Sequence, residues 1–200
     1  MLIHFISVGF SKDKYQLSHK SNPESGEQRM SSVLTGDEIR DLLRATLPLV
    51  EGVLDIDEQV QPNGIDLTLK EIALFSSPGS IGCADEARVL CSTSPLIFDG
   101  LGAIDLMPGC YLVTYNEIVH LPNDIMALAL PRSSFLRCSV SIHTAVWDAG
   151  YSGRSQSLMV VYNSYGFRLY KNTRTIQLVF FRLSHKVDQG YQGIFQGENI

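Results

Sequence analysis

The sequence predicts an all-β protein, a distorted β-barrel or jelly roll with one helix near its N-terminal end. From about residue 60 onward, the apolar residues gather in short runs rich in β-branched and aromatic side chains. Gly, Pro and Asn separate these runs, and no helical periodicity lies between them, as expected for a barrel, jelly roll or sandwich. With 200 residues, of which 44% are hydrophobic, the chain is long enough to bury a core as one globular domain.

The N-terminal part of the chain is expected to be an extension of this domain. Residues 11–33 are polar and show no apolar periodicity, which is typical of a mobile or linking segment. We therefore divide the chain into an N-terminal extension (1–34), a β domain (35–187) and a C-terminal segment (188–200).

A helix is predicted over the stretch TGDEIRDLLRATLP. Thr35 and Glu38 match a capping box, in which each side chain accepts a hydrogen bond from the backbone N–H of the other residue. Pro48 is expected to end the helix. The residues expected to line its apolar face are Ile39, Leu42, Leu43 and Leu47.

Strands are predicted where β-rich runs lie between turn residues. Strands at this spacing indicate a sandwich, jelly roll or barrel. The expected strands are GIDLTLKEIALF (64–75), GCYLVTYNEIVHL (109–121), DIMALAL (124–130), SLMVVYN (157–163), FRLY (167–170) and IQLVFFRL (176–183).

Positive charge is concentrated in one part of an acidic chain. The whole chain has a formal net charge of −5, but residues 131–187 contain eight Lys and Arg residues against a single acid, Asp148. Such a segment favours a small polyanionic ligand over a long nucleic acid, because the acidic remainder would repel an extended phosphate backbone. We therefore expect no direct nucleic-acid binding. The alternative is that these charges are scattered over solvated strand faces.

Cysteine spacing and the N-terminal residues indicate the compartment. The four cysteines form no Cys-x-x-Cys pair, which argues against a zinc ribbon and a dense disulfide framework. The apolar stretch MLIHFISVGF is too short to span a bilayer and has no basic leader. We expect a soluble cytoplasmic protein with buried or idle thiols and no membrane contact.

Several common catalytic motifs are absent from the sequence. No P-loop, no dinucleotide-binding glycine motif and no zinc deaminase signature is present. Ser133, His143 and Asp148 could form a nucleophilic triad on paper, but no nucleophile elbow surrounds the serine.

Four short blocks carry the remaining signal: QPNGIDLTL (61–69), PRSSFLR (131–137), VWDAGYSGR (146–154) and YKNTRTIQLVF (170–180). The second block places two guanidinium groups and two hydroxyls within a few residues, which suits phosphate oxygens, although a turn with surface arginines is the alternative. In order and spacing, the blocks resemble the dUTPase and dCTP deaminase superfamily, and most closely its archaeal-type dUTPase branch. The resemblance extends over about residues 35–200 and implies a dUTPase-like fold.

The resemblance implies a triphosphate site. The residues implied to bind the triphosphate are Arg132, Ser133, Ser134 and Arg137. In the fourth block, Arg174 and Gln177 match positions near phosphate, and a strand glutamine paired to backbone is the alternative for Gln177. Asp66 matches an aspartate that helps to hold the hydration shell of Mg²⁺, and an ordinary turn aspartate is its alternative.

The third block is implied to hold the reacting group and the nucleoside. Asp148 would orient and deprotonate a water for in-line attack on the α-phosphorus. Tyr151 would pack against the deoxyribose and leave no room for a 2′-hydroxyl. The backbone of His143, Thr144 and Ala145 would read the base. Trp147 is expected to be a core or interface anchor.

The C-terminal segment, residues 188–200, is implied to be a lid that closes over the nucleotide. Phe195 matches the aromatic residue near the base or sugar, and Gln196 matches a glutamine near phosphate, whereas Tyr191 matches less clearly. A disordered tail is the alternative, because chain ends are commonly poorly ordered.

A missing acid separates two reactions of the superfamily. Its dCTP deaminases need a glutamate about five residues after the glycine of the third block. Counting from Gly153 reaches Leu158, or Met159 with a shift of one residue, and neither side chain can carry a proton.

The resemblance therefore implies a Mg²⁺-dependent dUTP diphosphatase that forms dUMP and pyrophosphate. It also implies a homotrimer with active sites shared between subunits. A dCTP deaminase, a bifunctional relative, and a nucleotide-binding regulatory module without turnover are the alternatives.

Overall fold

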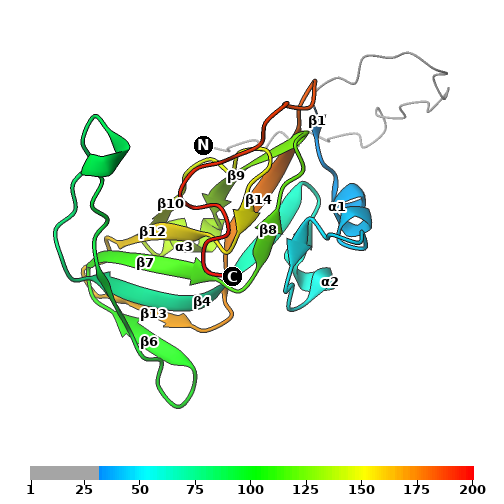
Figure 1. The fold of residues 1–200 in the computed structure, drawn as a ribbon. Helices are drawn as coiled ribbons and strands as arrows, with labels where there is room; N and C mark the ends of the chain where they lie inside the picture. Colours follow the sequence, from blue (N-terminus) through cyan, green and yellow to red (C-terminus); the bar gives the residue numbers. More distant parts are fainter. Residues whose placement is uncertain (1–31) are drawn as a thin grey trace, which may run out of the picture.

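The computed structural model describes residues 32–200 as curled antiparallel β-sheets with a few short helices (Figure 1). The expected N-terminal extension, residues 1–34, lies almost entirely outside the described residues. Among residues 32–200, none of the helices is both long enough and apolar enough to cross a membrane.

The predicted helix is present, but it is shorter than expected. α1 spans Gly36–Leu42, and its capping box is confirmed: the Thr35 backbone N–H donates to Glu38 Oε2 over 2.9 Å and the Glu38 N–H donates to Thr35 Oγ1 over 3.3 Å. The expectation that the helix continues to Pro48, with Leu47 on its apolar face, is wrong. Leu47 is 68% exposed, because the chain leaves the helix early to reach the next strand.

The structure also contains short helices that were not predicted from the sequence. α2 (Ile56–Gln59) begins at Asp55, whose carboxylate caps it, and α3 (Ser133–Arg137) lies within the PRSSFLR block. A single 3₁₀ turn, η1 (Asp85–Ala87), lies in an arm that projects from the sheet (Figure 1). Helices this short have no full apolar period, so periodicity could not reveal them.

The predicted all-β fold is confirmed, and every predicted strand has a counterpart. The run 109–121 contains two strands rather than one, because the chain turns at Asn116 and Glu117. The strands of residues 32–200 are β1 (Ser32–Val33), β2 (Val50–Glu51), β3 (Val60–Gln61), β4 (Gly64–Phe75), β5 (Thr93–Pro95), β6 (Ala103–Leu106), β7 (Gly109–Tyr115), β8 (Ile118–His120), β9 (Ile125–Pro131), β10 (Val140–His143), β11 (Ser152–Gly153), β12 (Gln156–Val161), β13 (Phe167–Tyr170) and β14 (Arg174–Arg182).

β4 links the two halves of the largest sheet. This sheet has the path β1-β14-β4-β7-β12-β10, and β9 adds to it through β14. The first half of β4 pairs with β14, and its second half pairs with β7, with an irregular register between Leu69 and Glu71. Such an irregularity bends a strand, so β4 follows the curl of the sheet. Smaller sheets join β11-β8-β2 and β13-β6.

A buried carboxyl group ties the turn after β7 to β4 and α2. Glu117 is fully buried, and it accepts hydrogen bonds from the Thr68 backbone N–H (2.8 Å), the Thr68 hydroxyl (2.6 Å) and the Gln59 amide (2.8 Å). Burial raises the pKa of Glu117, and these hydrogen bonds oppose that rise.

We expect Glu117→Ala to lower the free energy of unfolding by about 2–4 kcal/mol, because it leaves several buried donors without an acceptor. Urea denaturation of the variant and the parent protein measures the difference. Glu71→Ala, at an exposed position of β4, is the control and should change stability by less than about 0.5 kcal/mol. Equal midpoints for the two variants would contradict this role.

Candidate functional site

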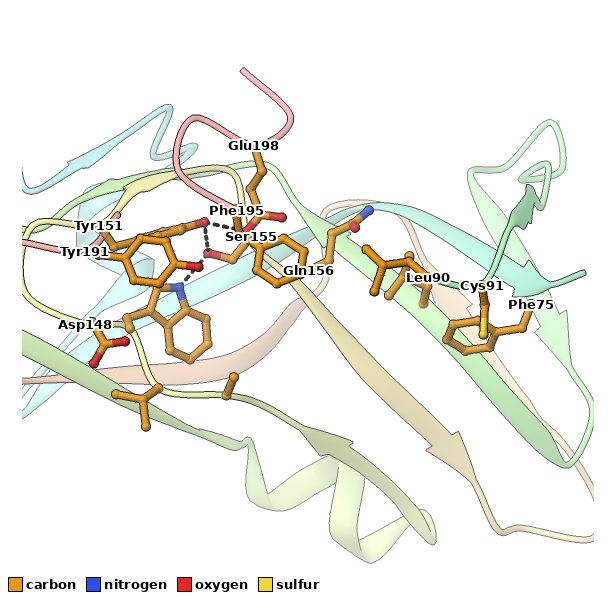
Figure 2. Close-up of a pocket in the computed structure, with 14 residues that line it drawn as sticks. Phe75, Leu90, Cys91, Asp148, Tyr151, Ser155, Gln156, Tyr191, Phe195 and Glu198 are labelled. Carbon is orange, nitrogen blue, oxygen red and sulfur yellow. Dashed lines mark hydrogen bonds between the residues drawn. The ribbon is translucent and has the colours of Figure 1, made fainter. Parts of the chain in front are cut away.

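A cavity of about 660 Å³ opens between the loop before β12, the C-terminal segment and the base of the projecting arm (Figure 2). Its volume is in the range of small-molecule sites. In Figure 2 an aromatic and polar end around Tyr151 is separated by Gln156 from an apolar end at Leu90. The lining residues are Phe75, Leu90, Cys91, Leu112, Ala145, Val146, Trp147, Asp148, Tyr151, Ser155, Gln156, Tyr191, Phe195 and Glu198.

Asp148 lies in the wall of this cavity. Its side chain is exposed, and it also borders a smaller hollow of about 400 Å³. The loop is held on both sides: Trp147 and Ala127 exchange backbone hydrogen bonds of 3.0 and 2.9 Å, and the Gly150 N–H donates to the Leu121 carbonyl over 3.1 Å. These bonds fix the backbone and leave the carboxylate facing open space, as a base that activates water requires.

A chain of hydrogen bonds leads from the core to the cavity. The expected anchor role of Trp147 is confirmed for the core, because it is only 5% exposed. Its indole N–H donates to Ser155 Oγ over 2.5 Å. The same Ser155 Oγ lies 3.1 Å from Tyr151 Oη. The Tyr151 hydroxyl in turn donates to Glu198 Oε1 over 2.8 Å. Burial raises the pKa of Tyr151, so the phenol stays a neutral donor at physiological pH.

The C-terminal segment folds back onto the loop of its own chain. The Tyr191 N–H donates to the Ala149 carbonyl and the Gly197 N–H to the Ser152 carbonyl, each over 2.8 Å. The Gln196 amide accepts from the Ser152 N–H over 2.9 Å and donates to the Gly150 carbonyl over 3.0 Å. In this arrangement Gln196 clamps the loop backbone.

Glycines permit this close approach. Gly150 has φ = +85°, and a Cβ there would lie 2.5 Å from Gly190 Cα. A side chain at this position would therefore be strained and would also push the segment away. Phe195, the aromatic residue of the predicted lid, lines the cavity.

The arginines of the second and fourth blocks converge at a different place, where β4, β9 and β14 lie side by side. Arg132 Nε lies 3.1 Å and Arg174 Nη1 3.6 Å from Asp66 Oδ2, and Arg174 Nη2 lies 3.2 Å from Glu58 Oε2. The Asp66 side chain is 3% exposed. Burial raises the pKa of Asp66, and the two guanidinium groups oppose that rise.

The remaining phosphate candidates lie on α3, directly after Arg132, and on β14. Ser133 and Ser134 are exposed at the start of α3, directly after Arg132, and Arg137 is exposed at its end. Gln177 lies opposite Asp66 in the β14–β4 register, half-buried, with its amide close to Gly64. Three of the four sequence blocks thus meet in one region of the surface.

Acids from outside the basic segment neutralise much of it. Arg168 pairs with Asp99 (2.9 Å) and Asp105 (2.6 Å), and Arg182 pairs with Asp124 (3.3 Å). The excess of positive charge in residues 131–187 therefore does not form one continuous surface of unpaired basic side chains. The four cysteines are free and exposed; of the expected buried or idle thiols, the buried alternative is therefore wrong.

Comparison with known proteins agrees with this fold and these blocks. A family model described as dCTP deaminase-like matches residues 33–183. The chain belongs to the dCTP deaminase-like family. The expected superfamily membership is thereby confirmed.

Two similar proteins carry the same name and match most of the chain. A "Probable deoxyuridine 5'-triphosphate nucleotidohydrolase" of Methanosarcina acetivorans is 47% identical over 168 residues, covering 84% of this chain and 98% of the relative. A relative of the same name from Archaeoglobus fulgidus is 44% identical over 169 residues, with coverages of 84% and 98%.

A solved structure shares the fold. The 2'-deoxycytidine 5'-triphosphate deaminase from Agrobacterium tumefaciens superposes with a TM-score of 0.58 at 23% sequence identity. The match covers 77% of this chain and 49% of that chain, so the present chain corresponds to about half of the deaminase chain.

The candidate residues of this dCTP deaminase-like chain form two separate groups. Ala145, Asp148, Tyr151 and Phe195 line the cavity, whereas the arginine cluster lies outside its lining. His143 is exposed at the end of β10, and the Thr144 hydroxyl donates to the Ala129 carbonyl over 3.1 Å; neither residue lines the cavity.

Sequence reasoning missed Glu198, the second carboxyl group of the cavity. It lies 47 residues after Tyr151, its partner, so no local spacing could connect them. The sequence signal that could have indicated Glu198 is its place in the predicted lid, residues 188–200. Burial raises the pKa of Glu198, and the hydrogen bond from Tyr151 opposes that rise.

Docking of the C-terminal segment is expected to weaken as the pH rises. Because the pKa of the docked Glu198 lies above its ordinary value of 4.5, its contribution is fully present below that value and is lost as the pH rises through the raised pKa. Hydrogen-exchange protection at residues 191–198, corrected for intrinsic exchange, should fall as the pH is raised above 4.5 through the raised pKa of Glu198. Glu198→Gln, which does not titrate, should remove this dependence, and an unchanged pH profile in the variant would contradict it.

Proposed function

We propose that this protein is a cytoplasmic dUTP diphosphatase, which hydrolyses dUTP to dUMP and pyrophosphate. One observation carries the proposal: the Asp148 carboxylate is exposed in the wall of a cavity whose size suits a nucleoside, on a backbone fixed from both sides. Relatives that are up to 47% identical over most of the chain and are named as dUTP nucleotidohydrolases support it.

In the proposed reaction, Asp148 orients a water molecule and accepts its proton as the water oxygen attacks the α-phosphorus. The new O–P bond forms as the bond from the α-phosphorus to the oxygen bridging to the β-phosphorus breaks, and pyrophosphate leaves. The proton then passes from Asp148 to solvent. Phosphoryl chemistry of this kind depends mainly on positioning and on neutralising phosphate charge.

Arg132 and Arg174 supply that neutralisation in the proposal, together with the hydroxyls of Ser133 and Ser134 and with Arg137 and Gln177. Asp66 holds the two guanidinium groups side by side before substrate arrives. Preorganised donors of this kind stabilise developing charge without rearrangement.

A Mg²⁺ ion carried by the triphosphate would screen further phosphate charge. Among residues 32–200, no group of three or more His, Cys, Asp and Glu side chains is arranged to hold a metal. Mg²⁺ on a nucleotide needs only one or two protein carboxylates, because phosphates and waters complete its shell. Asp66 fits this role poorly even through a water, because its carboxyl group is buried and its Oδ2 is paired with two guanidinium groups, which repel a cation.

The arginine cluster lies outside the lining of the cavity in the same chain. This separation supports a homotrimer in which one subunit brings its arginine cluster to the cavity of another. Light scattering after size exclusion tests the trimer. Mixing the Asp148→Asn and Arg132→Met proteins, assayed at a dUTP concentration well below the KM of the Arg132→Met protein, tests the sharing: mixed trimers should regain part of the activity, whereas a mixture no more active than its separate components after subunit exchange would contradict it.

One observation favours a second function, dCTP deamination. The two positions at which the deaminases of the superfamily need an acid argue against this function: Leu158 and Met159 are apolar, Met159 is fully buried, and Leu158 pairs with Leu112 in the sheet. Glu198, however, brings a second carboxyl group into the cavity from the C-terminal segment. A regulatory module without turnover is the less favoured reading, because it would not need the exposed Asp148 carboxylate.

One assay distinguishes these functions. The purified protein is incubated with dUTP, dCTP, dTTP or UTP in the presence of Mg²⁺, and both pyrophosphate and ammonia are measured. We expect pyrophosphate from dUTP and no ammonia from dCTP. Ammonia from dCTP would establish the deaminase, and binding of dUTP without any product would establish the regulatory module.

A further inference from the structure

We propose that Glu198 is a specificity-determining positioning residue: by holding the Tyr151 hydroxyl, it sets how strongly the site rejects a ribonucleotide. This inference rests on the proposed function, in which Tyr151 packs against the deoxyribose. It adds a residue from the C-terminal segment to the selection of the sugar.

The direction of the hydrogen-bond chain leaves one role for Glu198. The indole N–H of Trp147 can only donate, so Ser155 Oγ is its acceptor. The Ser155 hydroxyl proton is then available for Tyr151 Oη, and the Tyr151 proton goes to Glu198. Every proton of the chain has an acceptor when Glu198 is the terminal one; without Glu198 the phenol keeps only Ser155 Oγ as a partner, at 3.1 Å, and loses its hydrogen bond to a carboxyl group.

The local backbone is shaped for this contact. A Cβ at Gly153 would lie 2.6 Å from Tyr151 Oη and 3.1 Å from Glu198 Cγ, so the glycine leaves the space in which the two side chains meet. The Tyr191 ring packs edge-on against the Tyr151 ring, with centroids 5.7 Å apart at an angle of 69°. Two residues of the C-terminal segment therefore fix the Tyr151 ring, Glu198 at its hydroxyl and Tyr191 at its side.

A fixed ring is what discrimination against one extra hydroxyl requires. A wall that can shift by a fraction of an ångström accommodates a 2′-hydroxyl, whereas a wall held at two points resists it. Apolar walls otherwise reject an added hydroxyl only weakly. Because Glu198 is recruited with the segment, the selective wall is complete only when the segment is docked.

The experiment compares kcat/KM for dUTP and for UTP in Glu198→Ala, Glu198→Gln, Tyr151→Phe and the double variant Tyr151→Phe/Glu198→Ala. We expect Glu198→Ala to lower the dUTP/UTP ratio about tenfold, the size of one lost charge-assisted hydrogen bond. Glu198→Gln should restore most of the ratio, because its amide oxygen still accepts from Tyr151. Asp188→Asn, at an exposed position of the same segment, is the matched control and should leave the ratio unchanged.

The double variant tests whether Glu198 acts by positioning Tyr151 or only by helping the C-terminal segment to dock. If Glu198 acts through the Tyr151 hydroxyl, adding Glu198→Ala to Tyr151→Phe should change the ratio little further. A dUTP/UTP ratio in Glu198→Ala within twofold of the parent would overturn the inference, and so would a full tenfold additional loss in the double variant.

Binding of dUMP and UMP, measured by calorimetry, gives the same comparison without turnover. A parent protein that fails to hydrolyse dUTP would contradict the proposed function, whereas the dUMP/UMP affinity ratio would still decide the role of Glu198. Equal affinity ratios in the parent and Glu198→Ala proteins would overturn it.

Discussion

Asp148→Asn is expected to lower kcat for dUTP hydrolysis by about 10³-fold and to leave substrate binding nearly unchanged. The asparagine has almost the same shape as the aspartate, and the backbone bonds that hold the loop do not involve the carboxylate. The variant therefore loses the group that accepts a proton from water while it keeps the cavity. Pyrophosphate release under saturating dUTP measures kcat, and calorimetry measures binding.

Asp105→Asn provides a control for this prediction. Asp105 is an exposed carboxylate that pairs with Arg168 on the β6–β13 ribbon, outside the cavity lining. The control should keep kcat within about twofold. If Asp148→Asn retained the kcat of the parent protein, Asp148 would have no part in the chemistry.

Arg132→Met is expected to raise KM for dUTP about 10²-fold and also to lower stability. The loss of affinity follows from removing a charge-assisted donor to phosphate. The loss of stability arises because the buried Asp66 carboxylate loses its nearer partner and keeps only Arg174 at 3.6 Å. Since the Arg132 side chain is 34% exposed, solvent screens the pair, and we expect about 1–2 kcal/mol rather than the full cost of breaking a buried pair.

A second substitution separates these two effects. Asp66→Asn in the Arg132→Met background removes the uncompensated charge, so it should recover much of the lost unfolding free energy. It should not recover KM, because the phosphate donor is still missing. Recovery of KM by Asp66→Asn would show that Arg132 acts on substrate only through Asp66.

Local patterns in the sequence predicted much of the fold. The capping box of Thr35 and Glu38 needs only neighbouring residues, and the strand FRLY appears with its predicted bounds as β13. Alternation and turn residues are short-range signals, so they survive without knowledge of the rest of the chain. The same patterns could not show that α1 ends at Leu42, because the path to β2 and β8 decides where the helix ends.

Contacts between distant segments decided the rest. The eight basic residues of the segment 131–187 are countable in the sequence, but the acids that pair with four of them, Arg132, Arg168, Arg174 and Arg182, come from elsewhere in the chain: Glu58, Asp66, Asp99, Asp105 and Asp124. A charge count along the chain therefore overstated the basic surface, since salt bridges depend on separation in space.

The sequence by itself determined the family resemblance, through four blocks in order, and the stretch from His143 to Asn163 determined the place of Asp148 and the absence of an acid at Leu158. The tertiary structure alone decided that the cavity nevertheless contains a second carboxyl group. Glu198 reaches Tyr151 because backbone hydrogen bonds lay the C-terminal segment along the loop and glycines let the two come close. Residue order determines which groups a segment offers, whereas folding determines which groups share a cavity.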